Sequence, residues 1–529
     1  MIYKNQTNNE RQAILDIINS KPKTLEALAL INRQSAKKYG VAVSGNSRII
    51  ECYRVETTAK RISEDKEFER LLRRRVIRTQ SGIAPIAVLT KPFACPGKCA
   101  YCPTEKDVPQ SYLSNEPAVM RAIRCSYNPY VQVIDRLKAL VNNGHEPTKM
   151  ELIVIGGTWS VLPIKYKYWY IASCFAAANN FTGKKGKDSA MIKESYSLDR
   201  LKKILKSEQK RNEKAKYQII GLTLETRPDY ISENELQEMR ELGCTRVELG
   251  VQAIDDEVLK LNKRGHKVEA IVEATSLLRN YGFKITYHLM PGLPGSTIEK
   301  DFLMFKKLFS SPDFQPDQIK FYPTVVTKGS LLHKWWLAGK YVPYTDEELK
   351  KLIINCKAVV PGYVRIIRLI RDIPGESILA GNLITNLRQV LQQQGVKCSC
   401  IRCREPKSAP IDGYKFKTTT YDAAFGQEVF IEACSDNEKI LYGFCRLRLM
   451  QNNVAIVREL HVYGELVTIG GEVKVQHSGL GRQLLEKAEA IAISNSKKRL
   501  SIISGVGVRA YYRKFGYRLS GTYMVKSLG

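Results

Sequence analysis

The stretch Ala94–Glu105, ACPGKCAYCPTE, places Cys95, Cys99 and Cys102 in the spacing C-x3-C-x2-C. A structural zinc site usually takes two pairs of ligands, each pair close in sequence, and no fourth cysteine lies nearby in this chain. Three thiolates can instead hold three irons of a cubane cluster and leave the fourth iron open for a small molecule. Incidental cysteines are the alternative, which this spacing disfavours.

The composition predicts a large globular protein with an anionic partner. The 529 residues predict two or three domains. They include 83 Lys and Arg against 53 Asp and Glu, a formal net charge of +30. This excess favours nucleic acid over a membrane surface, with a merely basic surface as the alternative. We expect no membrane span and a cytoplasmic location, where the 13 cysteines would stay reduced rather than form a disulfide framework.

Four segments are expected along the chain. Residues 1–75 place apolar residues at helical spacing among basic ones, which predicts a basic helical region. Residues 76–390 alternate short apolar runs with helical stretches, and this pattern predicts a parallel sheet, barrel-like or doubly wound. Within this segment, residues 184–217 are expected to be a basic insertion. Residues 391–413 form a Cys-rich linker, and residues 414–529 predict a smaller α+β domain.

Glycines and polar residues follow several of the expected strands. Gly156, Gly157 and Thr158 come directly after MELIVI, and the segments 225–227 and 248–252 end two later strands. Barrel folds build their sites at these carboxyl ends. Each feature alone fits an ordinary turn or a structural charge. Their order on successive strands predicts a ligand site beside the three cysteines.

A second cysteine group, C-x-C-x2-C, contains Cys398, Cys400 and Cys403. It lies outside the barrel segment in a loop-rich junction, which favours structural zinc over unliganded thiols. The candidates for a fourth ligand, none of them favoured, are Cys434, Cys445 and His461.

The segment Gln476-His-Ser-Gly479-Leu-Gly481 leads directly into an expected helix. Such a helix start offers backbone N–H groups and the positive end of the helix dipole to a phosphate, and glycine permits close approach. With the strand RELHVYG before it and SGVGVRAYYRKFGYRL after it, the segment resembles the acetyl-CoA-binding core of the GNAT acetyltransferases. Of the adjacent Tyr511 and Tyr512, we expect Tyr512 to lie near the CoA thioester. The alternative is an ordinary core tyrosine.

The cysteine motif after the first strand, with an aromatic residue at Tyr101, resembles the radical S-adenosylmethionine (SAM) family. A radical SAM barrel followed by a GNAT domain resembles the family of the Elongator catalytic subunit, the third Elongator protein, in its stand-alone prokaryotic form. The resemblance covers residues 75–529. Among the matching stretches are RTQSGIAPIAVLTKPFACPGKCAYCP, EPAVMRAIRCSYNPYVQ, ETRPDY, GCTRVELGVQ, NKRGH and QHSGLGRQLLEKAE.

This resemblance implies an enzyme that modifies the wobble uridine of tRNA. It implies an α/β fold, with a partial (β/α) barrel of radical SAM type, a C-terminal α+β GNAT domain and a basic helical N-terminal region. The product would be 5-carboxymethyluridine or a derivative, made by an acyltransferase acting on uridine 34. The cofactors would be a 4Fe-4S cluster and SAM, cleaved to a 5′-deoxyadenosyl radical, with acetyl-CoA as substrate. The partner would be tRNA, while a homodimer and accessory subunits are left open.

The resemblance also assigns residues to these groups. The cluster ligands would be Cys95, Cys99 and Cys102. The SAM site would contain Tyr101, Gly156, Gly157, Thr158, Glu225, Arg227 and Gln252. Acetyl-CoA would be contacted by Lys149, Glu459, Leu460, His461, Val462, Gln476, Gly479, Leu480, Gly481, Arg482 and Tyr512, of which Lys149 and Tyr512 are the catalytic candidates. Phosphates of tRNA would be held, without sequence reading, by Arg73, Arg74 and Arg75.

One departure from the family pattern follows the third cysteine. Pro103-Thr104-Glu105 stands where Pro-Gly-Gly is usual, so the loop over the cluster is expected to differ. The main alternative function is a protein lysine acetyltransferase with a structural iron–sulfur domain. The net charge of +30 and the intact cysteine motif disfavour it. A non-catalytic tRNA-binding assembly subunit ranks last, because the Q-x-x-G-x-G segment is intact.

Overall fold

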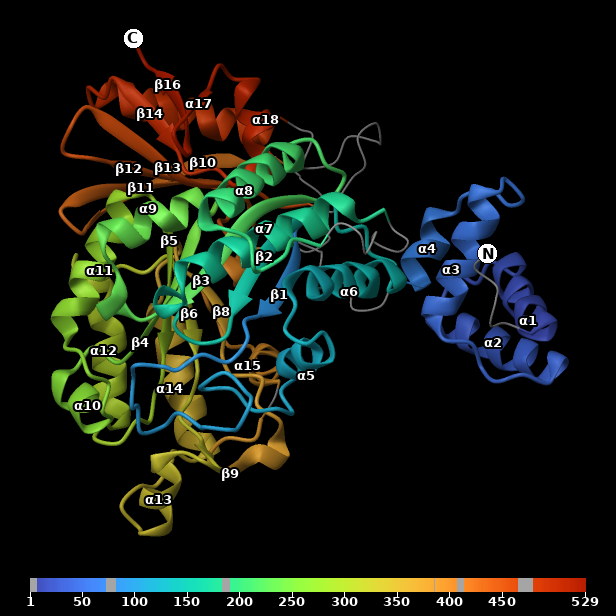
Figure 1. Ribbon diagram of the computed structural model, residues 1–529, viewed down its shortest axis with the longest axis horizontal. Coiled ribbons are helices and arrows are strands. Elements are labelled where there is room, and N and C mark those ends of the chain that lie inside the picture. Colours follow the sequence, from blue (N-terminus) through green and yellow to red (C-terminus); the bar gives the residue numbers. More distant parts are fainter. Residues whose placement is uncertain (1–6, 73–81, 183–190, 385, 407–412, 465–478) are drawn as a thin grey trace.

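The computed structural model describes residues 7–72, 82–182, 191–384, 386–406, 413–464 and 479–529. Figure 1 shows a small helical bundle at the N-terminal end beside a large barrel-like domain, with a third domain at the C-terminal end. Among the described helices, none is long and apolar enough to cross a membrane.

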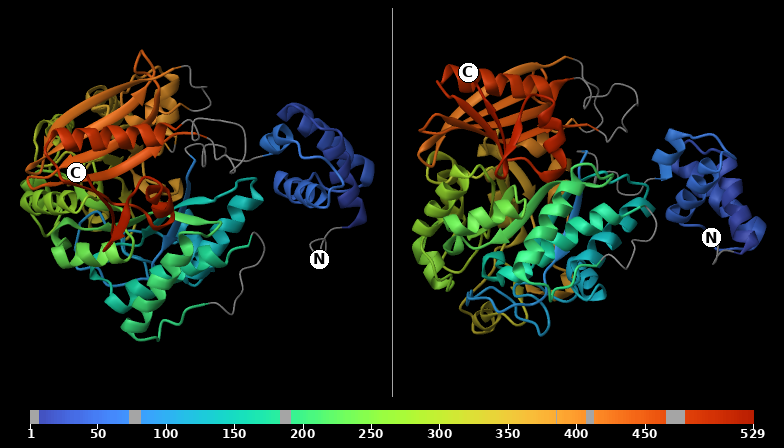
Figure 2. Two further views of the ribbon diagram at one scale, coloured as in Figure 1. Left: turned by 90° about the horizontal axis from the view of Figure 1, so that it is seen from above. Right: turned by 45° about the horizontal axis from the view of Figure 1, so that its top comes forward.

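The N-terminal bundle consists of four helices: α1 (Asn8–Asn19), α2 (Leu25–Tyr39), α3 (Asn46–Thr58) and α4 (Lys66–Leu72). Thr24 caps α2 through its side chain, and Gly40 ends this helix with a φ of 63°, as the sequence predicts. The bundle stands apart from the rest of the chain in both views of Figure 2. It touches the barrel domain through Arg54, whose Nη1 donates to the carbonyl oxygen of Val141 at 3.1 Å.

The barrel domain is built on a curled sheet of seven parallel strands in the order β1-β2-β3-β4-β5-β6-β8. Their bounds are β1 (Ala84–Leu89), β2 (Lys149–Ile155), β3 (Gln218–Thr226), β4 (Arg246–Gln252), β5 (Lys284–Leu289), β6 (Gln318–Phe321) and β8 (Arg365–Arg368). The central strands are buried along nearly their whole length, as expected where helices cover the outside and side chains fill the inside of a barrel. The confirmed barrel therefore has one strand more than the six runs recognisable in the sequence.

Helices cover the outer face of this sheet (Figure 1). They are α5 (Pro117–Arg124), α6 (Pro129–Asn142), α7 (Ile164–Asn180), α8 (Leu198–Asn212), α9 (Glu233–Glu241), α10 (Asp256–Leu261), α11 (Val268–Asn280), α12 (Ile298–Ser310) and α14 (Asp346–Val359). The short elements beyond them are β7 (Val326–Thr327), α13 (Leu331–Leu337), β9 (Ile378–Ala380), α15 (Leu387–Gln393) and α16 (Ile401–Arg404).

The basic segment 184–217 belongs in part to this outer layer. Residues 183–190 lie outside the described residues, but α8 packs along α7 and buries Leu201 and Leu205. Most of its lysines point away from the buried side. The described part of the expected insertion is therefore an amphipathic helix that covers the barrel and has a basic outer face. Its sequence resembles a charge run because only two of its leucines, Leu201 and Leu205, are fully buried.

The C-terminal domain holds a second seven-stranded sheet, in the order β10-β11-β12-β13-β14-β16-β15. Its elements are β10 (Lys415–Ala423), β11 (Gly426–Cys434), β12 (Leu441–Leu449), β13 (Val454–Val462), α17 (Leu480–Ser494), β14 (Arg499–Ile502), α18 (Arg509–Arg513), β15 (Arg518–Ser520) and β16 (Tyr523–Ser527). The pair β13 and β14 is parallel and joined only over Val454–Val457. Beyond Val457 the two strands are no longer paired, so the last five residues of β13 have no strand partner on the β14 side among the described residues.

A buried ion-pair network joins the C-terminal sheet to the barrel. Asp317 lies directly before β6, and its carboxylate accepts hydrogen bonds from Arg458 Nη1 and from the backbone N–H of Ile285, both at 2.9 Å. Glu428 binds Arg458 Nε at 2.9 Å and Arg279 Nη1 at 3.1 Å. These side chains are 0–1% exposed. Charges this deep are tolerated only when they are closely paired.

The arginines keep Asp317 ionised. Burial raises the pKa of its carboxyl, but the charges of Arg458, Arg446 and Arg279 outweigh burial and hold the pKa well below its usual range. The stability that this group contributes is therefore present above its unfolded pKa and is lost as the pH falls.

We expect Asp317→Asn to lower the free energy of unfolding at neutral pH by about 3–5 kcal/mol, because the buried Arg279, Arg446 and Arg458 would keep only Glu428 and Glu459 as counter-charges. Urea unfolding measures this change. Asp372→Asn is the matched control, since the Asp372 side chain is 67% exposed and pairs with Arg368 at the surface, where such pairs contribute about 1 kcal/mol or less. Equal losses for the two variants would contradict the structural role given to Asp317.

Candidate active site

One cavity of about 970 Å³ runs through the barrel domain. At the carboxyl ends of the strands it is lined by the cysteine loop, including Cys95, Cys99 and Cys102. At the amino ends of the strands it is lined by the C-terminal sheet, including Glu459 and His461. The strands β1, β2, β4 and β5, each six or seven residues long, separate these ends by a rise of about 20 Å. The cavity therefore joins the two motifs that the sequence places far apart.

Two arginines face the cysteine loop. Arg264 Nη1 lies 3.4 Å from Cys99 Sγ, and Arg227 Nη1 lies 3.9 Å from the same sulfur. The hydrogen bond with Cys102 lowers the pKa of Cys99, burial raises it, and both arginines lower it further, so that the pKa lies below that of an ordinary thiol. Thiolates are the form that binds metals. The loop therefore presents an activated ligand inside a cationic shell.

The cysteine loop fits an iron–sulfur cluster better than a single metal ion. Cys95 Sγ lies 4.0 Å from Thr158 Oγ1. The three sulfurs of this loop are not among the described groups that converge within 4.8 Å, as ligands of one ion would. Thiolates that bind different irons of a cluster need not converge on one point, and the nearby guanidiniums suit a cluster carrying negative charge.

A glycine turn after β2 closes over the same loop. Gly156 has a φ of 130°, and a Cβ there would lie 2.2 Å from Thr90 Oγ1, so no other residue fits. Gly157 follows with a φ of 105°. Gln252, at the end of β4, also has a positive φ of 69°, and its Oε1 is buried without a hydrogen-bond partner among the described residues. A buried acceptor of this kind suits a polar ligand.

A row of polar groups crosses the cavity wall from Glu225. Its carboxylate accepts a hydrogen bond from Tyr112 at 3.1 Å and lies 3.5 Å from His288 Nδ1. His288 Nε2 lies 2.8 Å from Glu248, which also binds Lys320. Burial raises the pKa of Glu248, but Lys320 and His288 lower it well below its usual range, so the carboxylate is ionised.

Sequence reasoning missed three of the residues at this end of the cavity. Glu225 and Glu248 were expected, but His288 and Lys320 lie inside the apolar runs FKITYHLMPG and QIKFYPTVV, and Arg264 lies in NKRGH without an assigned role. A charged or imidazole side chain in the middle of an otherwise apolar strand is the signal that could have found the first two, because such a group needs a buried partner.

At the end of the cavity formed by the C-terminal sheet, alternate residues of β13 point to opposite faces of that sheet. Glu459 and His461 line the cavity, whereas Leu460 and Val462 pack into the core of the C-terminal domain with Leu480. Burial raises the pKa of Glu459, but Lys284 and Arg446 lower it to about 2. Burial lowers the pKa of His461 to about 4. An ionised carboxylate and a neutral imidazole therefore face the same space at neutral pH.

The start of α17 is built from glycines, as the sequence predicts. Gly479 is the N-cap, with a φ of 77°. A Cβ on Gly481 would lie 2.6 Å from the hydroxyl oxygen of Tyr511, so this tyrosine covers the helix start. Tyr512, the residue expected at the thioester, lies in the core of the C-terminal domain. Arg482 is exposed and pairs with Glu486 at 2.7 Å.

Three sequence expectations fall elsewhere. Gln476 and Arg73–Arg75 lie outside the described residues. Lys149 is the first residue of β2 and does not line the cavity, although burial lowers its pKa. Its neighbour in the sheet, Gln218, packs against Gly507 of the C-terminal domain. Lys149 thus lies near that domain but away from the polar groups described above.

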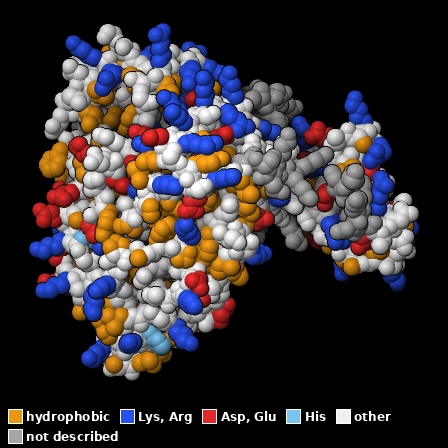
Figure 3. Space-filling view, viewed as in Figure 1, with side chains coloured by type: hydrophobic (Ala, Val, Ile, Leu, Met, Phe, Trp, Pro, Cys, Tyr) orange, Lys and Arg blue, Asp and Glu red, His pale blue; other side chains and the backbone are white. Residues whose placement is uncertain are grey.

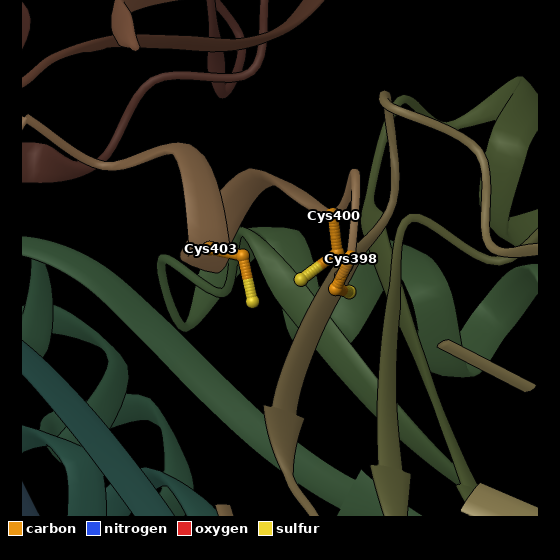
Figure 4. Close-up of side chains that lie close together, drawn as sticks. All are labelled: Cys398, Cys400 and Cys403. Atoms are coloured by element: carbon orange, nitrogen blue, oxygen red, sulfur yellow. The ribbon is translucent and has the colours of Figure 1, made fainter. Parts of the chain in front are cut away.

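The second cysteine group does converge. The sulfurs of Cys398, Cys400 and Cys403 lie within 4.8 Å of one another around the start of α16 (Figure 4). Three soft thiol ligands at this separation fit one zinc ion. The converging set contains none of the suggested fourth ligands, Cys434, Cys445 and His461.

The cavity carries an excess of positive charge. Twelve of its lining residues are Lys or Arg and six are Asp or Glu. Figure 3 also shows Lys and Arg side chains gathered over the upper part of one face, around the C-terminal domain and α8. A cavity lined mainly by charges of one sign raises the local concentration of ligands that carry the opposite charge. The expected ligand is therefore an anion.

The fold and the cysteine loop define a protein of the radical SAM class: residues 89–305 match the family model described as the radical SAM superfamily, and residues 316–395 match the radical SAM C-terminal domain. The tRNA uridine(34) acetyltransferase of Dehalococcoides mccartyi is 43% identical over 86% of this chain and 100% of its own length. The chain belongs to the family of the tRNA uridine(34) acetyltransferases and Elongator complex protein 3.

Two further relatives extend this likeness. Human Elongator complex protein 3 is 36% identical, with 94% of this chain and 92% of the relative covered. The solved structure of the archaeal Methanocaldococcus infernus Elp3 with an N-terminus deletion superposes with a TM-score of 0.70 at 38% identity, covering 84% of this chain and 99% of that one.

We expect Cys99→Ser to lose the iron and acid-labile sulfide bound after anaerobic reconstitution, together with the visible absorption of the cluster, because a central thiolate ligand is removed. Cys125→Ser is the control: this thiol is buried at the C-cap of α5 and does not line the cavity. Retention of full iron by Cys99→Ser would rule out the assignment of the cluster to this loop.

Proposed function

We propose that this protein modifies the wobble uridine of tRNA at C5, with acetyl-CoA as the source of the new carbon unit. The observation that carries the proposal is the single cavity that connects the cysteine loop with Glu459 and His461. The relatives named tRNA uridine(34) acetyltransferase support it, because this chain matches them over 86–93% of its length.

Cys95, Cys99 and Cys102 would hold a 4Fe-4S cluster. When bound, the cluster and SAM supply a carbon-centred radical that can take a hydrogen atom from an unactivated methyl group. The glycine turn at 156–158, Tyr101 and Gln252 would position SAM, and Glu225 with Arg227 would complete the site. Arg227 is itself fixed by Asp229 at 2.7 Å, so its charge stays close to the sulfur of Cys99.

The C-terminal domain would bind acetyl-CoA. Its phosphates would lie at the start of α17, where the N–H groups of Leu480 and Gly481 begin the helix. The rest of the molecule would follow β13 where its pairing with β14 has ended. Glu459 and His461 would then face the acetyl group. The Nε2 of His461 is buried without a hydrogen-bond partner among the described residues, so a neutral imidazole would be free to accept a proton from water during thioester hydrolysis.

The two tyrosines of α18 would divide their roles. Tyr511 lies over Gly481 and would contact the bound CoA, whereas Tyr512 would support the same site from the core. Lys149 stays a proposed acetyl-CoA contact from the barrel side. Zinc at Cys398, Cys400 and Cys403 would fix the junction between the two domains.

The macromolecular partner would be tRNA. The cationic cavity and the net charge of +30 suit a polyanion, and Arg73–Arg75 would add phosphate contacts. Protein lysine acetylation is the weaker alternative. It needs an open peptide groove at the acetyl group, whereas Glu459 and His461 face a cavity that leads to the cysteine loop.

The reconstituted full chain, given SAM, acetyl-CoA, a reductant and tRNA without oxygen, should produce 5-carboxymethyluridine at position 34. Nuclease digestion and mass spectrometry detect this nucleoside. A tRNA carrying cytidine at position 34 serves as the control and should stay unmodified. Absence of the product, with acetylation of a lysine peptide instead, would overturn the proposal in favour of the alternative.

Gly481→Val should weaken acetyl-CoA binding at least tenfold and leave SAM binding unchanged, because the added side chain would compete with Tyr511 for the helix start. Calorimetry with each ligand measures both affinities. Gly375→Ala is the control, since a Cβ there meets no atom within 4 Å. An unchanged acetyl-CoA affinity in Gly481→Val would remove α17 from the site.

A further inference from the structure

The short helix α16 carries one cation to the wall of the cavity. Its N-cap is Cys400, and the N–H of Ile401 donates to the carbonyl oxygen of Val364 at 2.9 Å. Arg404 anchors the other side of the helix, with Nη2 at 2.9 Å from Glu432 and 2.8 Å from the carbonyl oxygen of Gly362. Arg402 lies between these anchors and lines the cavity. The helix is therefore held on two sides while Arg402 faces inward.

Arg402 has no hydrogen bond or ion pair among the described residues. The charges acting on it come from Arg365, Glu405 and Arg388. Arg365 pairs with Glu405 and donates to the hydroxyl of Tyr463 at 2.9 Å. Arg388 donates to the carbonyl oxygen of Ile366 at 2.7 Å. Two further guanidiniums but only one carboxylate, already paired with Arg365, thus act on Arg402 at the cavity wall. Because uncompensated charges in a half-buried place are costly, the arrangement calls for an anion.

We propose that Arg402, supported by Arg365 and Arg388, holds a phosphate of the substrate RNA that flanks the modified nucleoside. This inference rests on the proposed function. A nucleoside that enters a cavity for chemistry leaves its stack and brings its own phosphates to the rim. Guanidinium groups match phosphate geometry with two parallel hydrogen bonds, and such contacts position the RNA without reading its sequence.

The position of Arg402 favours an RNA phosphate over the phosphates of CoA. The start of α17 lies against the face of β13 that carries Leu460 and Val462. Arg402 lines the cavity, which His461 faces from the opposite side of β13, and Tyr463 is among the groups that act on Arg402. The CoA phosphates at α17 would therefore be separated from Arg402 by the sheet. Metal binding by Cys398, Cys400 and Cys403 would then hold α16 in the position that presents Arg402 to the cavity.

The test uses the full chain and an anticodon stem-loop RNA with uridine at the wobble position. Two further RNAs carry a neutral methylphosphonate in place of the phosphate on the 5′ or the 3′ side of that uridine. Binding is measured for the wild type, Arg402→Gln, Arg402→Lys and Lys397→Gln. Lys397 is the matched control: it is an exposed cation of the same loop that does not line the cavity. Thermal unfolding checks that the variants stay folded.

Arg402→Gln should bind the unmodified RNA about tenfold more weakly, with a salt dependence lower by about one unit of slope. One of the two methylphosphonate RNAs should bind the wild type about tenfold more weakly than the unmodified RNA does, but should bind Arg402→Gln as well as the unmodified RNA does. Such a result would mean that Arg402 contacts the replaced phosphate. Arg402→Lys should lose less than Arg402→Gln, and Lys397→Gln should respond to the methylphosphonates as the wild type does.

The inference would be overturned if the methylphosphonate and Arg402→Gln each weakened binding and their effects on the binding free energy were additive. So would a loss of acetyl-CoA affinity in Arg402→Gln with RNA binding intact, since the phosphate would then be that of CoA. Failure of the proposed function has a different result: the wild type would show the coupling between Arg402 and the phosphate but form no carboxymethyluridine.

Discussion

The buried ion pair between Asp317 and Arg458 is the contact on which the geometry of the cavity depends. Asp317 directly precedes Gln318 of β6, and Arg458 directly precedes Glu459 of β13, and both of these neighbours line the cavity. The same carboxylate accepts the N–H of Ile285 in β5. One group therefore fixes two barrel strands against the C-terminal sheet. Because paired charges in a dry interface lose much of their stability when shifted, the two domains are held in one register.

This register gives the cavity two chemically different ends. The carboxyl ends of the barrel strands bring a thiolate under two arginines, and the amino ends meet an ionised carboxylate and a neutral imidazole. Neither end can complete the proposed reaction alone, because the strands between them rise about 20 Å. A substrate base held in the middle would have the radical source on one side and the acetyl group on the other. The excess of cations along the walls suits the phosphates that such a base brings with it.

Local patterns in the sequence predict most of the fold. Apolar runs mark six of the seven barrel strands, and Thr24 and Gly40 mark the ends of a helix by capping chemistry. The strand β8, RIIR, is not predicted because it has only two apolar residues between arginines. The ion-pair network is not predicted either, since Asp317 and Arg458 are 141 positions apart and no local pattern encodes their pairing. Adjacent residues of a helix point in directions about 100° apart, so Tyr511 and Tyr512 face different surroundings. The sequence alone does not say which of the two faces the core.

The central claim is that both ends of the cavity act on one substrate, and transfer of an isotope tests it most directly. The reconstituted full chain would be given tRNA, SAM and acetyl-CoA carrying a fully deuterated methyl group. If the acetyl group meets the radical in this cavity, the 5′-deoxyadenosine formed should contain one deuterium, and the new nucleoside should contain the other two. Deoxyadenosine without deuterium, formed at the same rate with or without acetyl-CoA, would contradict the account.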